Sequence, residues 1–222
     1  MQSNKKGFTL LELLIVIAIL AVLGAIVVFL LNPAETLRKA RDSQRISDLS
    51  TIKTALGIYI ASKTSPSMDN QSGSSINEKC IGGSGVDTIW ITDSAVTDIN
   101  ASGTTGAFLT VATTSVANTA FTSGSGWLPV NLDSLTGGSP ISNMPVDPTN
   151  AANDVATIAS SSLMYRYACK KSPLGFEVNA RLESGAFGPG GDDDRATKDG
   201  GDNPTLYEVG TDLKILPPAG DF

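Results

Sequence analysis

The chain has 222 residues, of which 41% are hydrophobic and 17% charged, with a net charge of −6 and no histidine. This acidic balance argues against nucleic acid as an obligate partner, because phosphate binding needs clustered cations. The lack of histidine removes the commonest general base and the commonest transition-metal ligand, so we do not expect an enzyme. The length predicts one domain of about 150 residues plus a long additional element.

The first predicted element is an apolar run over residues 13–31, which contains no charged or strongly polar side chain. Its length is close to the ~20 residues that cross a bilayer as a helix. After residue 62 the chain is instead rich in Ser, Thr, Gly, Asn and Asp. We therefore expect one membrane-spanning element followed by a globular domain.

Three interpretations of the N-terminal segment compete. A cleaved signal peptide has a shorter apolar core of ~7–15 residues and a small-residue cleavage site, for which residues 21–25 are a weak candidate. A plain signal anchor explains the length and the flanking Lys5 and Lys6, but it leaves Gly7 and Glu12 unexplained. A carboxylate in hydrocarbon costs ~2.5–3.5 kcal/mol, so Glu12 needs a functional reason.

The third interpretation rests on the stretch KKGFTLLE at residues 5–12, followed by the apolar run. It resembles the class III signal peptide of type IV prepilins and of the pseudopilins of type II secretion systems. In that family a prepilin peptidase cuts after the glycine, and the new N-terminal residue is N-methylated. The resemblance implies cleavage between Gly7 and Phe8. It makes Glu12 an assembly residue, paired with the Phe8 amine of a neighbouring subunit; its own Phe8 amine, or protonation, is the alternative neutralisation.

The resemblance also implies a location and partners. The positive-inside rule opposes it, because more basic residues follow the span than precede it. The family nevertheless inserts its leader facing the cytoplasm, and the Ser- and Thr-rich domain is typical of an external one. We therefore expect a single-pass precursor in the inner membrane, and then an extracellular pilus or a periplasmic pseudopilus. The implied partners are copies of the chain, the prepilin peptidase, an assembly platform and an assembly ATPase.

The predicted helix continues past the membrane span to about residue 63. Asn32 at the N-cap, Pro33 at the first helical position and Glu35 favour a bend or an interruption at Asn32 and a restart. Apolar residues then recur at three- and four-residue steps, which is typical of an amphipathic helix. The basic residues here either face solvent or pair with acidic groups of adjacent subunits. They are Arg38, Lys39, Arg41 and Arg45.

Beyond the helix we expect a β-rich domain. The clearest strands are residues 163–169 and 176–183, whose alternation predicts a hairpin with one buried face. Shorter strands are predicted at residues 88–92, 107–112, 205–209 and 213–216. The prediction is an α+β fold, with a long N-terminal helix packed against a C-terminal antiparallel sheet. This arrangement resembles the pilin fold.

The predicted domain organisation follows from these elements. It consists of a cleaved leader (1–7), a transmembrane and assembly helix (8–31), an amphipathic second half of that helix (32–63) and a globular head domain (64–222). The two cysteines, Cys80 and Cys169, lie 89 residues apart and are predicted to form a disulfide outside the cytoplasm. Two buried free thiols are the alternative.

An acidic segment over residues 188–203 is the candidate metal site. It carries five aspartates within eleven residues, and calcium takes six to eight oxygen ligands. The spacing differs from that of an EF-hand, although some pseudopilins hold calcium in a C-terminal loop. A solvated acidic loop is the alternative. The candidate calcium ligands are Asp192, Asp194, Asp199 and Asp202.

The function expected from the sequence is that of a structural subunit of a type IV pilus-like filament. A pseudopilin of a type II secretion system, or a minor pilin in DNA uptake or adhesion, is the second interpretation. A membrane-anchored enzyme or sensor is the third. The sequence offers neither a G-x-S-x-G nor a P-loop pattern to support it.

Overall fold

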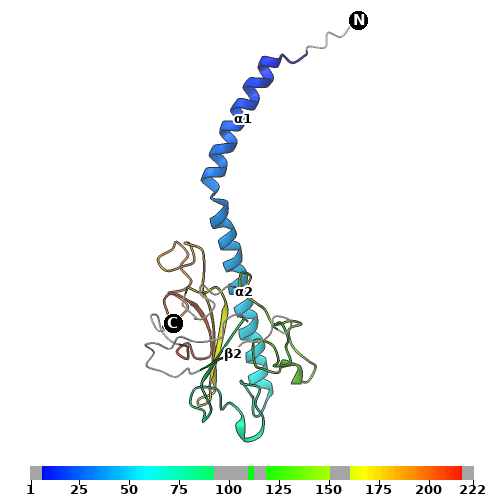
Figure 1. Ribbon diagram of the computed structural model, residues 1–222, viewed down its shortest axis with the longest axis vertical. Coiled ribbons are helices and arrows are strands. Elements are labelled where there is room, and N and C mark those ends of the chain that lie inside the picture. The colour runs from blue at the N-terminus through cyan, green and yellow to red at the C-terminus, as the bar shows by residue number, and fades with distance from the viewer. Residues whose placement is uncertain (1–6, 93–109, 113–118, 151–160, 217–222) are drawn as a thin grey trace. The chain divides into compact units, whose positions relative to one another are not determined.

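A computed structural model describes residues 7–92, 110–112, 119–150 and 161–216, with the backbone alone at 28–31 and 110–112. The chain divides into two compact units, Met1–Arg38 and Lys39–Phe222 (Figure 1). We call the second unit the head; it contains residues 39–63 as well as the predicted head domain 64–222.

Two helices occupy the N-terminal third of the chain and are separated at Asn32. They are α1 (Leu10–Leu31) and α2 (Pro33–Ser62). Asn32 adopts the left-handed conformation, with φ 38° and ψ 73°, and its carbonyl accepts the N–H of Glu35 at 3.0 Å. Pro33 has no N–H with which to continue the ladder of α1, while its fixed φ suits a helix start. The predicted interruption at Asn32 is confirmed.

The head contains a five-stranded sheet with the order β2-β1-β3-β4-β5. The strands are β1 (Thr88–Ile91), β2 (Thr110–Ala112), β3 (Tyr165–Lys170), β4 (Gly175–Ala180) and β5 (Tyr207–Gly210). Strands β1, β3, β4 and β5 pair antiparallel, and β2 adds a parallel edge beside β1. The predicted α+β class is confirmed. Of the predicted strand at 107–112, residues 107–109 lie outside the described part of the chain.

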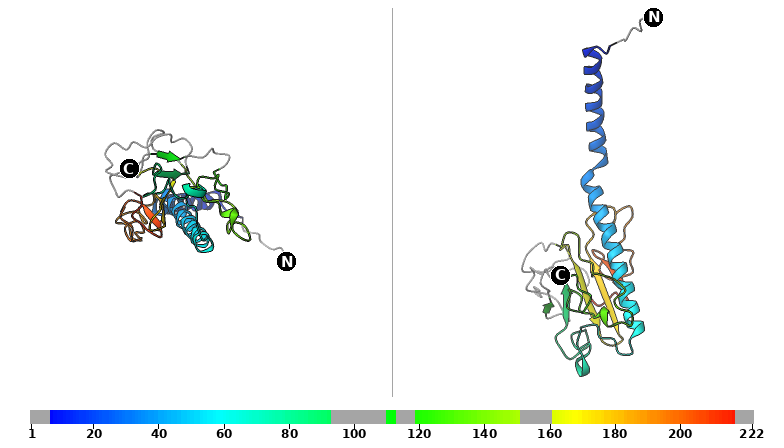
Figure 2. Two further views of the ribbon diagram at one scale, coloured as in Figure 1. Left: turned by 90° about the horizontal axis from the view of Figure 1, so that it is seen from below. Right: turned by 90° about the vertical axis from the view of Figure 1, so that its right-hand side faces the viewer.

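The core lies between α2 and one face of the sheet (Figure 2). The apolar stripe of α2 is buried there, including Leu49, Ile52 and Leu56, each at most 1% exposed. From the strands come alternate residues such as Tyr167 and Val178, which lie opposite one another in the β3–β4 register. The apolar residues at helical spacing on α2 and the apolar residues at alternate positions of the strands therefore pack in one layer.

The second face of the sheet is buried as well, so the prediction of a hairpin with one buried face is wrong. Its residues are polar: Arg166, Glu177, Asn179 and Glu208 are each at most 2% exposed. The alternation of polar and apolar residues correctly predicted which side chains share a face of the sheet. It did not predict that the polar face is buried, because alternate polar residues are also typical of a strand with one face in solvent. The cover comes from segments distant in the chain.

Residues 213–216 supply part of that cover, and the prediction of a strand there is wrong. The N–H groups of Ile215 and Leu216 both donate to Oε2 of Glu177 at 2.9 Å. A buried side-chain carboxylate therefore replaces the neighbouring strand as their acceptor. Both side chains are buried, at 4% and 1% exposure.

The disulfide between Cys80 and Cys169 is present, as predicted. Cys169 lies on the core face of β3, and the Cα atoms of the pair are 4.7 Å apart. Backbone hydrogen bonds accompany the bridge: the N–H of Ile81 donates to the Cys169 carbonyl at 2.8 Å, and Lys171 donates to the Ile81 carbonyl at 2.9 Å. The loop that follows α2 is thereby attached to the centre of the sheet.

We predict that replacing both cysteines by alanine lowers the free energy of unfolding of the head by about 4–5 kcal/mol, because the bridge closes a long loop in the unfolded chain. Tryptophan fluorescence during urea unfolding of the detergent-solubilised chain measures this, since Trp127 is fully buried. Lys171→Met is the control, because it keeps the bridge. A loss below about 1 kcal/mol for the double variant contradicts the prediction.

Candidate functional site

The site begins at Gly7 and Phe8, just before α1. Thr9 is the N-cap of α1: its hydroxyl oxygen accepts the N–H of Glu12 at 3.2 Å. In return, the Glu12 carboxylate accepts the backbone N–H of Thr9 at 2.9 Å and its hydroxyl at 2.8 Å. This is a capping box, which satisfies two otherwise unpaired donors at the helix start. Phe8 is 80% exposed.

The role of Thr9 was missed in the sequence reasoning, although the signal was present. Residues 9–12 read T-L-L-E, which is the S/T-x-x-E pattern of a capping box. The consequence is a second partner for the carboxylate. That partner is Thr9 of the same helix, which donates both its N–H and its hydroxyl to Glu12.

The rest of α1 is apolar on every side. Leu10–Val27 is long and apolar enough to cross a membrane, and none of this window is buried within the chain. Successive residues lie about 100° apart around a helix, and four of them in a row are 46–58% exposed: Leu13, Leu14, Ile15 and Val16. An all-round apolar helix without cover is stable only in lipid or against other apolar helices.

Residues 2–28 match the family model of the prokaryotic N-terminal methylation motif. The chain carries the signal segment of a type IV pilin or pseudopilin. The family of proteins with this motif is structural, and the motif supports insertion of a precursor into a membrane. The match ends at residue 28, so the architecture of the head is known from its structure alone.

No curated protein and no solved structure matches the chain. The head therefore has to be interpreted from its own contacts.

Arg45, which lies fully buried on α2, is the centre of a cluster of charged residues in the head. Its Nε and Nη2 bind both carboxylate oxygens of Asp147 at 2.7 and 2.9 Å. Its Nη1 binds Asp42 at 2.9 Å and Glu183 at 2.6 Å. Burial lowers the pKa of Arg45, but the hydrogen bonds and charges of Asp147 and Glu183 outweigh it and keep the guanidinium ionised.

Glu183 connects this cluster to Arg41, whose Nε and Nη2 bind its two oxygens at 2.9 and 2.7 Å. The hydrogen bond from Arg41, followed by that from Arg45, lowers the pKa of Glu183 to about 2. Arg41 and Arg45 thus bind carboxylates of their own head. For the buried Arg45, neither interpretation offered from the sequence, a solvated face or pairing with an adjacent subunit, is correct; the side chain of Arg41 is still 37% exposed. Arg38 pairs with Glu35 of its own helix at 3.7 Å.

The sequence predicted that this strand continues to residue 183, but β4 ends at Ala180. The contacts of Asp42 explain the difference. Its carboxylate accepts the backbone N–H of Glu183 at 2.9 Å and that of Ser184 at 2.7 Å. These donors therefore bind a side chain on α2 and not a neighbouring strand. The buried cluster of Asp42, Arg45, Asp147 and Glu183, which we call the Arg45 cluster, joins α2 to two loops of the head.

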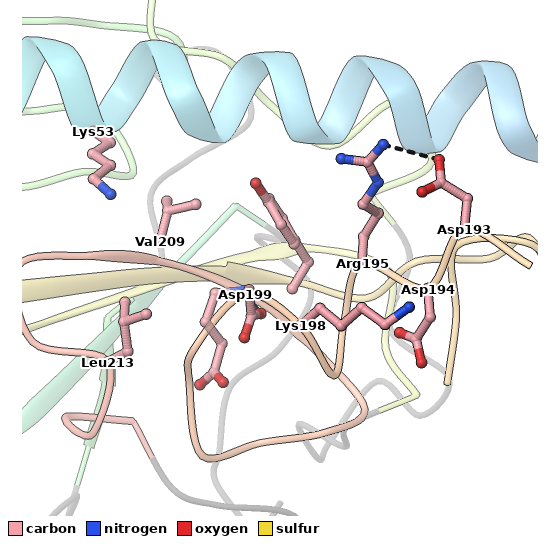
Figure 3. A pocket seen from close by; sticks show the side chains of 10 residues that line it. Lys53, Asp193, Asp194, Arg195, Lys198, Asp199, Val209 and Leu213 are labelled. Atoms are coloured by element: carbon pink, nitrogen blue, oxygen red, sulfur yellow. Dashed lines mark hydrogen bonds and ion pairs between the residues drawn. The ribbon is translucent and has the colours of Figure 1, made fainter. Parts of the chain in front are cut away.

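Two of the four candidate calcium ligands, Asp194 and Asp199, line a polar pocket of about 420 Å³ beside α2 (Figure 3). Asp194 is engaged within its own loop: it accepts the N–H of Gly190 at 2.9 Å and both the N–H and the hydroxyl of Thr197 at 3.0 and 2.6 Å. The Thr197 hydroxyl and the two N–H groups lower the pKa of Asp194 to about 2. Asp199 accepts the N–H groups of Gly201 and Glu208.

The remaining two candidates do not complete a site. Asp192 is exposed, and Asp202 has one buried oxygen, Oδ1, without a hydrogen-bond partner in the described part of the chain. In residues 7–92, 110–112, 119–150 and 161–216, no three acidic or other ligating side chains are grouped to hold a metal. Because calcium takes six to eight oxygens, these side chains by themselves do not supply a complete set of ligands. Calcium binding stays a prediction.

Two buried carboxyl groups lie beside this pocket, on the polar face of the sheet. Burial, together with the hydrogen bond and the charge of Glu177, raises the pKa of Glu208 far above the ordinary glutamate range. Burial also raises the pKa of Glu177. One proton is therefore retained by the pair at neutral pH.

We predict that Arg45→Met lowers the free energy of unfolding by about 3–5 kcal/mol, because it leaves buried carboxylates without a cation. Arg38→Met is the matched control, since Arg38 is exposed and makes one long ion pair; we expect a change within about 0.5 kcal/mol. Urea unfolding of both variants near pH 7 measures the difference. Equal losses in the two variants contradict a structural role for the Arg45 cluster.

We also predict that the head becomes less stable as pH rises from about 5 to about 8. The unfolded chain releases the Glu208 proton near pH ~4.3, whereas the folded chain retains it, so unfolding is favoured by up to ~1.4 kcal/mol per pH unit. Glu208→Gln reduces this slope. Glu78→Gln is the control: Lys171 and Ser84 lower the pKa of Glu78, so the slope in this window stays unchanged. A wild-type stability that is flat over this range contradicts the assignment.

Proposed function

We propose that the chain is a structural subunit of a type IV pilus-like filament. In this proposal the prepilin peptidase cuts after Gly7, Phe8 becomes the N-methylated N-terminus, and α1 holds the subunit in the inner membrane until assembly. The observation that carries it is an apolar helix without cover, preceded by a methylation motif and carrying one carboxylate at its start. Once the subunit has left the membrane, the α1 helices of other copies bury its apolar surface in place of lipid.

Glu12 selects the contact between copies. Its carboxylate is occupied by the N–H and hydroxyl of Thr9, which are neutral donors. Cleavage creates a cationic amine at Phe8, and a charged donor forms a hydrogen bond roughly twice as strong as a neutral one. In an apolar helix bundle the amine of a neighbouring copy then replaces the neutral donors and fixes the axial register. Contacts that do not close on themselves generate a filament.

Chemistry resides in the partners under this proposal. The peptidase and an assembly ATPase with its platform act on the chain, which supplies no catalytic residue. The proposed domains follow: leader 1–7, assembly helix 8–31, amphipathic helix 32–63 and head domain 64–222. The disulfide supports an oxidising destination outside the cytoplasm. A pilus at the cell surface, or a pseudopilus in the periplasm, is where such a subunit ends.

We predict that Glu12→Ala is processed normally but lowers the yield of sheared surface fibres by about tenfold or more, the equivalent of about 1.4 kcal/mol per contact. Glu12→Gln separates charge from capping, because an amide oxygen still accepts from Thr9; we expect it to fail like Glu12→Ala. Thr9→Ala is the reciprocal control, which removes the hydroxyl of the cap but keeps the charge, and we expect near-normal fibres.

Mass spectrometry of the N-terminus and electron microscopy of sheared material measure processing and assembly. A mature chain that begins with methylated Phe8 in long fibres supports the pilus. Confinement of the mature chain to membranes supports the pseudopilin instead. A full-length chain that retains Met1, or full assembly of Glu12→Gln, contradicts the proposal.

A further inference from the structure

Two buried carboxyl groups lie side by side on the polar face of the sheet. In the β4–β5 register Glu177 is opposite Gly210 and Asn179 is opposite Glu208, so the side chains of Glu177 and Glu208 are diagonal neighbours on one face. Each is at most 2% exposed. Within the described part of the chain, neither forms an ion pair. We call them the Glu177–Glu208 pair.

The cations around the pair are bound to, or balanced by, other groups of the described residues. Arg166 lies on the same face, but the Asn179 side chain separates it from the pair: its oxygen accepts from Arg166 at 3.4 Å, and its Nδ2 donates to Glu177 at 3.5 Å. Lys170 binds Asp212 at 2.9 Å. The pocket of Figure 3, which Glu208 also lines, adds three cations, three carboxylates that balance them, and one tyrosine: Lys53, Arg195, Lys198, Asp193, Asp194, Asp199 and Tyr207. The sequence of the head contains no Lys or Arg at residues 93–109, 113–118, 151–160 and 217–222.

Further carboxylates make a second negative charge at the pair costly. Gly201 lies against Glu208, since a Cβ added to it would fall 1.9 Å from Oε2 of that carboxyl group. Burial, the contact with Glu177 and then the charge of Asp199 raise the pKa of Glu208. Burial and the charge of Asp202 raise the pKa of Glu177 less, because backbone N–H groups also bind its ionised form. Glu208 therefore keeps a proton at neutral pH and donates it in a hydrogen bond to Glu177.

Residues 213–216 depend on the pair for their hydrogen bonds. The N–H groups of Ile215 and Leu216 both donate to Oε2 of Glu177 at 2.9 Å, and within the described part of the chain residues 213–216 make no other hydrogen bond. By contrast, Asp199 attaches its own segment to β5, because its carboxylate accepts a backbone N–H of that strand at 2.7 Å. Strands β4 and β5 are held together by their ladder. The 213–216 segment is therefore the part of the cover that moves most easily when the pair changes its charge.

We propose that the Glu177–Glu208 pair is a proton-dependent latch for residues 213–216. With one proton between the two carboxyl groups the latch is closed. Loss of that proton leaves two adjacent buried charges, and the segment separates from the sheet so that water reaches them. The open state binds one proton fewer, because a solvated glutamate ionises near pH ~4.3, so opening becomes up to ~tenfold more favourable for each unit by which the pH rises. The latch does not depend on filament assembly.

The peptide bond between Lys214 and Ile215 reports the state of the latch. Lys214 is exposed, but the N–H of this bond is one of the two that Glu177 holds. A lysine-specific endoprotease therefore cuts the bond after the segment is released. The bond that follows Lys53, in the middle of α2, is the internal reference, because cutting it requires unfolding of the helix. Mass spectrometry follows both cleavages in the full, detergent-solubilised chain from about pH 6 to about pH 8.

Three variants separate the latch from other effects of pH. Glu208→Gln keeps the shape of the side chain and does not titrate, so its cleavage rate at each pH also corrects for the pH dependence of the protease. Glu78→Gln is the matched control, because Lys171 and Ser84 lower the pKa of Glu78 and this group stays ionised over the range. We expect cleavage after Lys214, relative to Glu208→Gln, to rise about tenfold or more in the wild type and in Glu78→Gln. Glu177→Gln removes the other charge and is expected to weaken the rise.

An intact bond after Lys53 shows that each variant is folded and that the opening is local. A wild-type rate that follows the rate of Glu208→Gln across the range overturns the latch. So does cleavage after Lys53 that rises in step with cleavage after Lys214, since the head then unfolds as a whole. If Glu208→Gln is itself cut after Lys53 at every pH, Glu177→Gln decides by the same comparison: a rise as steep as in the wild type overturns the latch, and a weaker rise supports it.

Discussion

The attachment of α2 to the loops of the head depends on the buried guanidinium of Arg45. Arg45 has no solvent contact, and its guanidinium binds carboxylates from α2, from the loop at Asp147 and from the segment that follows β4. A guanidinium offers five donors in a rigid plane, which allows a bidentate contact with Asp147 and two further contacts from Nη1. Removing charges from water is expensive, so such a cluster persists only when every member is paired. That requirement fixes α2 relative to two loops that the apolar core alone does not restrain.

The same logic extends to the polar face of the sheet. Glu177 accepts two backbone N–H groups from residues 215 and 216, and this holds the C-terminal segment over the sheet. Burial favours the protonated state of its neighbour Glu208, which avoids two adjacent negative charges. The disulfide attaches the other end of the head, after α2, to β3. The sheet is therefore enclosed on both faces, by an apolar layer on one and by polar contacts on the other.

The two units differ in how they bury apolar surface. Residues before Arg38 bury nothing among the described side chains of α1, and their apolar surface is available to lipid or to other copies. The head has its own apolar core, which lies between α2 and one face of the sheet. Burial of an exposed apolar helix supplies association free energy in proportion to the area removed from water. The capping box at Thr9 and Glu12 keeps the carboxylate of α1 paired within its own helix.

The sequence by itself determined the features that depend on neighbours in the chain. The methylation motif, the apolar span, the restart after Asn32, the amphipathic stripe of α2 and the alternation of β3 and β4 all follow from local pattern. The pairing of Thr9 with Glu12 also follows from local sequence, because residues 9–12 have the pattern of a capping box. These succeed because helix and strand periods and capping are set within a few residues.

Only the tertiary structure decided what distant segments do to one another. It assigned Arg41 and Arg45 to carboxylates more than 100 residues away, buried the second face of the hairpin, and gave residues 213–216 a carboxylate partner in place of a strand. It also turned the carboxylates of Asp194 and Asp199 towards their own backbone and not towards a common ion. A charged or polar residue has the same appearance in sequence whether it faces water or a distant partner, because burial depends on which loops fold over it.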